Sequence, residues 1–167
     1  RAAKLPGTAA PKIEVEPVRH GAPASGADEV ERAFDIVGDL GFGSAGVVRR
    51  AVRRSDGRLV ALKAMRCIDD RGLSPTVDNE YELLKGIDHP NIVRALDWLI
   101  CPGCIFLVLD FFDGRDLLMT VNASPLKRLA EDTAQSLSIQ LVAAIEHLHK
   151  RRIVHRDIKP QNVLVAR

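Results

Sequence analysis

The stretch between residues 34 and 65 most limits the possible fold, because three short runs that each read as a strand follow one another with only tight turns between them. The runs are "FDIVGDL" (34–40), "VVRRAVRR" (47–54) and "RLVALKAM" (58–65). Turns this short can join antiparallel neighbours only. The sequence therefore predicts an antiparallel meander that turns first through "GFGSAG" (41–46) and then through "SDG" (55–57).

Two more strands and two helices are predicted downstream. "ALDWLI" (95–100) and "IFLVLD" (105–110) flank Pro102-Gly103 and predict a hairpin. Ser74-Pro75 predicts the start of a helix, since a capping residue precedes a proline at the first helical position. That helix would carry Glu80, Leu83, Leu84 and Ile87 on one face. A longer helix, about 131–150, would carry an apolar stripe of Ala134, Leu137, Leu141, Ile145 and Leu148.

The first 27 residues differ in composition from the rest of the chain. Fourteen of them are Ala, Pro or Gly, so the segment buries too little apolar surface to offset its ordering entropy. We expect residues 1–27 to be a disordered tail. The whole chain has a net charge of +2 without the concentrated basic face of a nucleic-acid-binding protein, and its most apolar run (98–109) is too short to span a bilayer. No nucleic-acid or membrane partner is therefore expected.

The chain has three cysteines, Cys67, Cys101 and Cys104. A count this small and odd does not indicate a disulfide framework. Cys101-Pro-Gly-Cys104 has the spacing of a zinc or redox site, but no second Cys/His pair completes a metal site, so a structural role is favoured. Sparse cysteines, together with residues 1–27 that lack the apolar core of a signal peptide, predict an intracellular protein, cytoplasmic or nuclear.

Two motifs in the meander suggest phosphate binding. Gly41, Gly43 and Gly46 lie in a turn between strands, where glycine lets backbone N–H groups approach phosphate oxygens; a plain glycine-rich hairpin is the alternative. "VALK" puts Ala61 and Lys63 on one strand face, toward the underside of that turn; the alternative is a solvated lysine. Each motif alone leaves both interpretations open.

A third motif, "HRDIKPQN" (155–162), places Asp157, Lys159 and Asn162 in a tight loop. These are groups that could deprotonate a hydroxyl, neutralise a phosphate and hold a metal ion. In order along the chain, the glycine-rich hairpin, "VALK", a helical glutamate, "HPNIV" and this loop match the protein-kinase motif set. From about residue 34 the sequence closely resembles eukaryotic protein kinases, and Lys159 resembles the serine/threonine type.

The resemblance implies an α+β fold. A kinase-like N-lobe, with a five-stranded antiparallel sheet and one helix, would span residues 28–112 including the hinge, and residues 113–167 would begin a mainly helical C-lobe. It also implies ATP and Mg²⁺ as cofactors. We expect the full-length protein to phosphorylate a serine or threonine hydroxyl of a protein substrate. The alternative is a non-catalytic nucleotide-binding or scaffold module of kinase fold, and the regulatory partner is not encoded in these residues.

Each matching residue takes a role from the resemblance. Asp157 would orient the substrate hydroxyl and accept its proton, and Lys159 would offset charge on the transferring group. Asn162 would ligate Mg²⁺. Lys63 would hold the α- and β-phosphates and pair with Glu80. Other nucleotide contacts would come from Leu40, Gly41, Gly43, Ser44, Gly46, Val48, Ala61, Leu109, Asp110, Phe112, Asp116 and Leu164.

Among these, the backbones of Asp110 and Phe112 would read the adenine edge, and Asp116 would reach the ribose. Arg156 would grip a phosphate on an activation loop. The resemblance places a second metal-binding aspartate, in the sequence Asp-Phe-Gly, about a dozen residues after Asn162. The sequence given has five residues there, so the chain as given is expected to be inactive and aggregation-prone. Its strand at 163–166 would lack a hairpin partner and expose an edge, and its long helix would lack much of its packing surface and expose an apolar patch.

Overall fold

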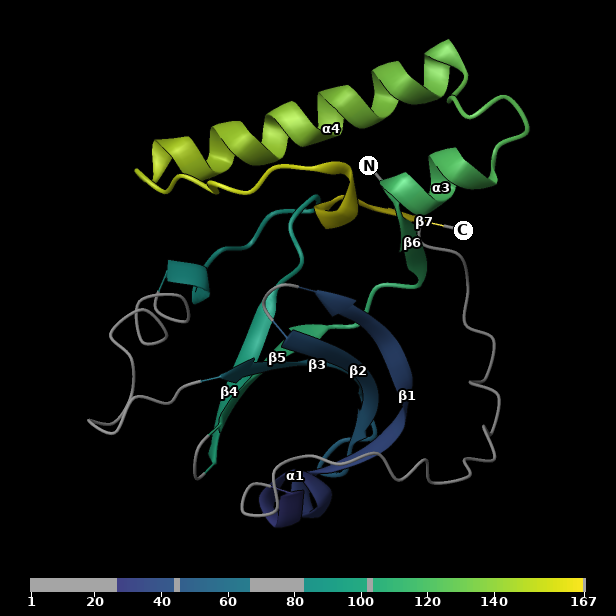
Figure 1. Ribbon diagram of the computed structural model, residues 1–167. Coiled ribbons are helices and arrows are strands. Elements are labelled where there is room, and N and C mark those ends of the chain that lie inside the picture. Colours follow the sequence, from purple (N-terminus) through teal and green to yellow (C-terminus); the bar gives the residue numbers. More distant parts are fainter. Residues whose placement is uncertain (1–26, 44–45, 67–82, 102–103, 167) are drawn as a thin grey trace.

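The computed structural model describes residues 27–43, 46–66, 83–101 and 104–166. A five-stranded antiparallel sheet with strand order β1-β2-β3-β5-β4 forms the N-terminal part (Figure 1). Its strands are β1 (Phe34–Gly43), β2 (Gly46–Arg53), β3 (Leu59–Arg66), β4 (Ala95–Cys101) and β5 (Cys104–Asp110). The predicted meander, the predicted hairpin and the kinase-like fold class are confirmed.

Strand β1 is irregular at two points, where its register against β2 shifts between Ile36 and Gly38 and again between Asp39 and Gly41. Such bulges bend a strand and increase its twist, and β1 curves along the edge of the sheet (Figure 1). Leu40, predicted to contact the nucleotide, lies in the second bulge and is 47% exposed.

One face of the sheet carries the hydrophobic core. A short helix that the sequence did not predict, α1 (Ala27–Ala33), lies against this face (Figure 1). The backbone N–H of Arg54 donates to the Ala33 carbonyl at 2.9 Å, which joins the end of α1 to the turn between β2 and β3. The buried core consists of Val30, Phe34, Ala51, Val60, Leu62, Cys101, Phe106 and Val108.

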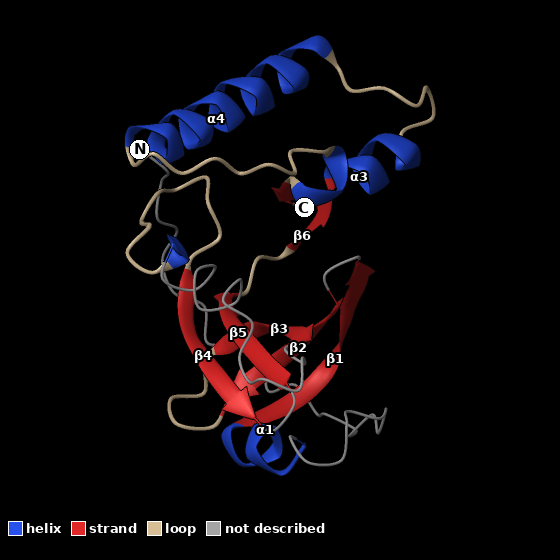
Figure 2. Ribbon diagram, turned by 60° about the vertical axis from the view of Figure 1, so that its left-hand side comes forward, coloured by secondary structure: helices blue, strands red, loops and turns tan. Residues whose placement is uncertain are grey.

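The C-terminal part is mainly helical (Figure 2). The helix α4 (Glu131–Lys150) has the predicted boundaries, with acidic residues in its first turn and basic residues in its last turn, as the helix dipole favours. Among the described residues, no helix is at once long enough and apolar enough to cross a membrane. The other elements are β6 (Gly114–Asp116), α3 (Leu117–Ala123), the 3-10 turn η1 (Pro160–Asn162) and β7 (Leu164–Ala166).

The strand predicted at 163–166 has one neighbour, and its other edge is unpaired among the described residues. Strand β7 pairs antiparallel with β6, in a register that places Leu164 opposite Asp116 and Ala166 opposite Gly114. The N–H of Leu117 also donates to the Val163 carbonyl at 2.8 Å. The sequence could not indicate this partner, because both strands are three residues long and lie far apart along the chain.

The apolar stripe of α4 is covered only in part. Leu148 is 7% exposed and the other stripe residues are half-buried, because the segment after α4 folds back beneath it (Figure 1). A second contact comes from the loop before β4, where Asn91 Nδ2 donates to the Gln140 carbonyl at 3.1 Å. Beside the stripe, the apolar side chains of Ile139 and Val142 on α4 are 64% and 63% exposed.

The predicted helix start at Ser74-Pro75 lies outside the described residues, as does Glu80. Leu83 and Leu84 are helical, and Ile87 is buried at 4% exposure.

Candidate active site

The strand register assembles one half of the site. Lys63 on β3 lies opposite Val48 on β2, and Ala61 lies opposite Leu109 on β5. Paired residues of an antiparallel sheet project from the same face, and so do residues two apart on one strand. Val48, Ala61, Lys63 and Leu109 therefore share the face opposite the hydrophobic core, so the structure brings together four residues predicted to surround the nucleotide.

The glycine-rich hairpin continues this face at one end of β1 and β2. Gly41 pairs with Val48, and Gly43 pairs with Gly46. Gly46 has a φ of 124°, and a Cβ added there would lie 2.1 Å from the Ala64 carbonyl oxygen. Only glycine fits that position, because any other side chain would clash with the backbone of β3. Ser44 lies outside the described residues.

The second half of the site is the loop of residues 153–163, in which Asp157 is held by two neighbours. Its Oδ2 atom lies 2.8 Å from Lys159 Nζ and accepts a hydrogen bond from Asn162 Nδ2 at 2.9 Å. The same Nδ2 also donates to the Asp157 carbonyl at 2.7 Å. The other carboxylate oxygen, Oδ1, accepts no hydrogen bond from the residues that the structure describes. The contacts of Oδ2 thus fix the carboxylate, while Oδ1 can accept a hydrogen bond from a substrate.

Backbone geometry positions this carboxylate. Arg156 has a φ of 65°, a left-handed conformation that is uncommon for a residue with a Cβ and that turns the chain just before Asp157. The N–H of Asp157 donates to His155 Nδ1 at 3.3 Å. Pro160 begins η1, and the N–H of Asn162 donates to the Lys159 carbonyl at 2.9 Å. The loop therefore brings together Asp157, Lys159 and Asn162, three of the five residues predicted to act in catalysis.

The contacts of Asp157 also shift its ionisation. Hydrogen bonds from Lys159 and then Asn162 hold the pKa of the Asp157 carboxyl below its ordinary value of 3.8. Since the folded pKa lies below the unfolded one, this interaction favours folding above pH 3.8 and is lost as the pH falls through the folded value. Asp157 is therefore ionised at neutral pH, as a proton acceptor must be.

We predict that Lys159→Met raises the pKa of Asp157 toward 3.8, because it removes the larger of the two interactions that favour the carboxylate. Titration of the Asp157 carboxyl carbon by NMR measures this without any assay of activity. Lys150→Met, which removes an exposed lysine paired with Glu146 on α4, should leave the Asp157 titration unchanged. An unshifted pKa in Lys159→Met would contradict the contact.

The loop is suited to hold a magnesium ion through Asn162. Both neighbours of its amide, the carbonyl and the carboxylate of Asp157, are acceptors, so Nδ2 must face them and Oδ1 is directed away. An amide oxygen is a ligand that Mg²⁺ accepts. Among the described residues, no group of three or more His, Cys, Asp or Glu side chains is placed to hold a metal ion, so Asn162 would be a single ligand.

The segment that joins the two parts carries three of the other predicted contacts, and the strand β7 paired with it carries a fourth. Asp116 and Leu164 lie opposite each other in the β6–β7 pair, and Leu164 is 44% exposed. Asp116 caps α3, because its Oδ1 accepts from the Met119 N–H at 2.7 Å, a structural role that was not predicted. Asp110 ends β5, and Phe112 follows it with 40% exposure.

Arg156, the residue predicted to bind a phosphate on an activation loop, is exposed.

A cavity of about 480 Å³ lies outside this site, at the α1 end of the sheet. It is lined by Arg32, Phe34, Arg53, Trp98 and Leu99 among others. Sequence reasoning also missed the charged residues Asp56 and Arg58 of the β2–β3 turn, for which "SDGR" gave only a turn signal.

Comparison with known proteins agrees with this geometry. The family profile described as protein kinase domain matches residues 34–167, so the chain belongs to the protein kinase family. The chain is 35% identical over 136 residues to Serine/threonine-protein kinase DCLK1 of Rattus norvegicus, across 81% of this chain and 31% of the relative. It is 38% identical over 144 residues to Cell division control protein 2 homolog 3 of Trypanosoma brucei brucei, across 83% and 44%. These names confirm the resemblance to eukaryotic serine/threonine kinases, and the chain spans less than half of either relative.

Proposed function

We propose that the protein carrying this chain is an ATP-dependent serine/threonine kinase, which transfers the γ-phosphoryl group of ATP to a hydroxyl of a protein substrate. The observation that carries the proposal is the Asp157 carboxylate, whose Oδ2 is held by Lys159 and Asn162 while Oδ1 is unengaged by the described residues. A carboxylate fixed in this way can accept a hydrogen bond from an incoming hydroxyl and orient it for attack.

In the transfer step, the substrate oxygen forms a bond to the γ-phosphorus while the bond to the β–γ bridging oxygen breaks, and the hydroxyl proton passes to Asp157 Oδ1. The Lys159 ammonium, which lies 2.8 Å from Asp157, offsets negative charge on the transferring group. Magnesium, when bound, neutralises charge on the phosphate oxygens, and Asn162 Oδ1 would be one of its ligands.

The sheet supplies the nucleotide contacts in this proposal. The backbone of the glycine-rich hairpin would cover the phosphates, and Lys63 would bind the α- and β-phosphates from the same face as Val48 and Ala61. The backbones of Asp110 and Phe112 would contact the adenine edge. Glu80 would pair with Lys63, Arg156 would bind a regulatory phosphate, and the site would operate inside the cell, in cytoplasm or nucleus, where ATP is available.

The experiment is a phosphotransfer assay on the full-length protein with ATP, Mg²⁺ and peptides that differ only in carrying serine, threonine or tyrosine. We expect phosphate on serine and threonine peptides. Transfer to tyrosine alone would contradict the specificity, and ATP binding without transfer would favour the scaffold alternative. The 167 residues alone should show no turnover, because the charge neutralisation that transfer requires needs more metal ligands than Asn162 provides.

A further inference from the structure

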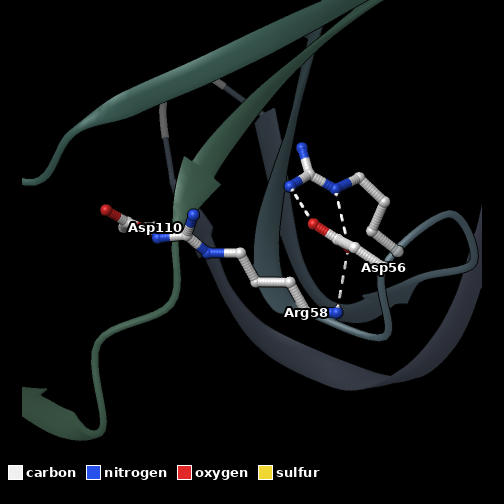
Figure 3. Close-up of polar contacts among 4 residues, drawn as sticks. Asp56, Arg58 and Asp110 are labelled. Carbon is white, nitrogen blue, oxygen red and sulfur yellow. Dashed lines mark hydrogen bonds and ion pairs between the residues drawn. The ribbon is translucent and has the colours of Figure 1, made fainter.

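The turn between β2 and β3 holds charged side chains that the proposed mechanism does not use (Figure 3). Asp56 Oδ1 accepts from Arg53 Nε at 3.0 Å and from the Arg58 N–H at 3.1 Å, while Asp56 Oδ2 accepts from Arg53 Nη2 at 2.5 Å. The hydrogen bonds from Arg53 and then from Arg58 lower the pKa of Asp56 to about 2. The carboxylate therefore stays ionised, and these contacts persist, at neutral pH.

Backbone hydrogen bonds fix the same turn. The N–H of Arg53 donates to the Arg58 carbonyl at 2.8 Å, and the N–H of Gly57 donates to the Arg53 carbonyl at 2.8 Å. On its other side, the turn is bonded to the end of α1 through Arg54 and Ala33. Arg58 therefore projects from a well-fixed backbone, so binding a partner orders its side chain without any further ordering of the backbone.

That partner is Asp110. The guanidinium Nη2 of Arg58 forms an ion pair with Asp110 Oδ1, although the two residues are 52 positions apart in the sequence (Figure 3). Asp110 lies opposite Val60 in the register of β3 and β5, and its N–H donates to the Arg94 carbonyl at 2.9 Å. Asp110 is thus held by its side chain and by its backbone at the point where the chain leaves the sheet.

We propose that Arg58 is a positioning residue for the nucleotide: through its ion pair with Asp110 it fixes the backbone of residues 110–112 that contacts the adenine edge. The inference rests on the proposed function. Val60, opposite Asp110, belongs to the core on the other face of the sheet from Lys63. The Asp110 side chain is therefore anchored away from the nucleotide face, which leaves its backbone to meet the adenine.

The proposal predicts that Arg58→Ala raises the KM for ATP about two- to five-fold at nearly unchanged kcat, the range expected from loss of a partly exposed ion pair. The preference for ATP over GTP should fall by a similar factor, because GTP keeps the phosphate contacts and differs only at the base edge. Arg58→Lys should restore part of both values, since a single ammonium can replace the one Nη2 contact. The measurements are steady-state kinetics of the full-length protein with both nucleotides.

A matched control exists on the same turn. Arg54 forms an ion pair with Asp35 on β1, with both side chains about half exposed, and this pair does not involve residues 110–112. Arg54→Ala should therefore leave the KM for ATP and the ATP/GTP ratio at their wild-type values. Thermal unfolding of both variants reports whether their general stability is affected equally.

The outcomes are distinct. If Arg58→Ala and Arg54→Ala have the same KM for ATP and the same ATP/GTP ratio, the positioning role is wrong while the proposed function stands. If Arg58→Ala does not fold, Arg58→Lys and Asp110→Asn are compared with the wild type in its place. An unchanged ATP/GTP ratio in both variants would show that the positioning role of Arg58 is wrong. A wild-type protein that neither binds ATP nor transfers phosphate contradicts the proposed function, and this inference with it.

Discussion

Replacing Asp157 with asparagine is expected to lower the turnover of the full-length protein by about 10²–10⁴-fold, with little change in ATP affinity. The amide oxygen can take the place of Oδ2 and keep the contacts with Lys159 and Asn162, so the loop should hold its shape. The amide nitrogen then takes the place of Oδ1, where it is a donor and cannot accept the hydroxyl proton. Single-turnover kinetics measure the rate, and titration with a fluorescent ATP analogue measures the affinity.

The control for this variant is Asp132→Asn, an exposed carboxylate in the first turn of α4 that lies outside the site. It should turn over at the wild-type rate. If Asp157→Asn weakened ATP binding by as much as it slowed transfer, the residue would act on the nucleotide rather than on the hydroxyl, and the assigned role would be wrong.

Replacing Lys63 with methionine should abolish detectable transfer and leave the fold largely intact. Lys63 lies in the centre of β3, between Val48 and Leu107, and is half-buried. Methionine has an unbranched side chain of similar length, so it can fill the same space while it removes the charge that would bind the α- and β-phosphates. Phosphate transfer to a serine peptide measures the loss, and thermal unfolding checks the fold.

The control for Lys63→Met is Lys150→Met, which makes the same change at an exposed lysine of α4. It shows whether loss of a positive charge outside the site affects transfer. This variant should retain activity. Wild-type turnover in Lys63→Met would show that the phosphates are anchored elsewhere, whereas a large fall in its unfolding temperature would show that the lysine supports the sheet instead.

Local sequence signals explain which elements could be predicted from the sequence. The predicted strands are short runs rich in apolar residues and bounded by turn residues, and α4 repeats its apolar residues over 20 positions, so each carries its own signal. Helix α1 has seven residues and places only Val30 in the buried core, and β6 and β7 have three residues each. Segments as short as α1 and β6 form because of their neighbours, and no local pattern indicates them. Strand β7 was predicted as a strand, but its pairing with β6 was not.

The candidate site divides in the same way. Asp157, Lys159 and Asn162 lie within six positions of one another, so a local motif could predict that they meet. The two bulges of β1, the capping role of Asp116 and the ion pair of Arg58 with Asp110 depend on which strand lies beside which. Such contacts between distant segments follow from tertiary packing, and the sequence alone gave no reason to select them.

The β6–β7 pair has a mechanical consequence. It joins the segment that has just left the sheet, at Gly114–Asp116, to the segment that begins two residues after Asn162. If the sheet swings about the segment before Gly114, the pivot therefore lies near Asn162, the residue proposed to bind magnesium. Such a swing would move the glycine-rich hairpin much further than Asp157 and its two partners, Lys159 and Asn162.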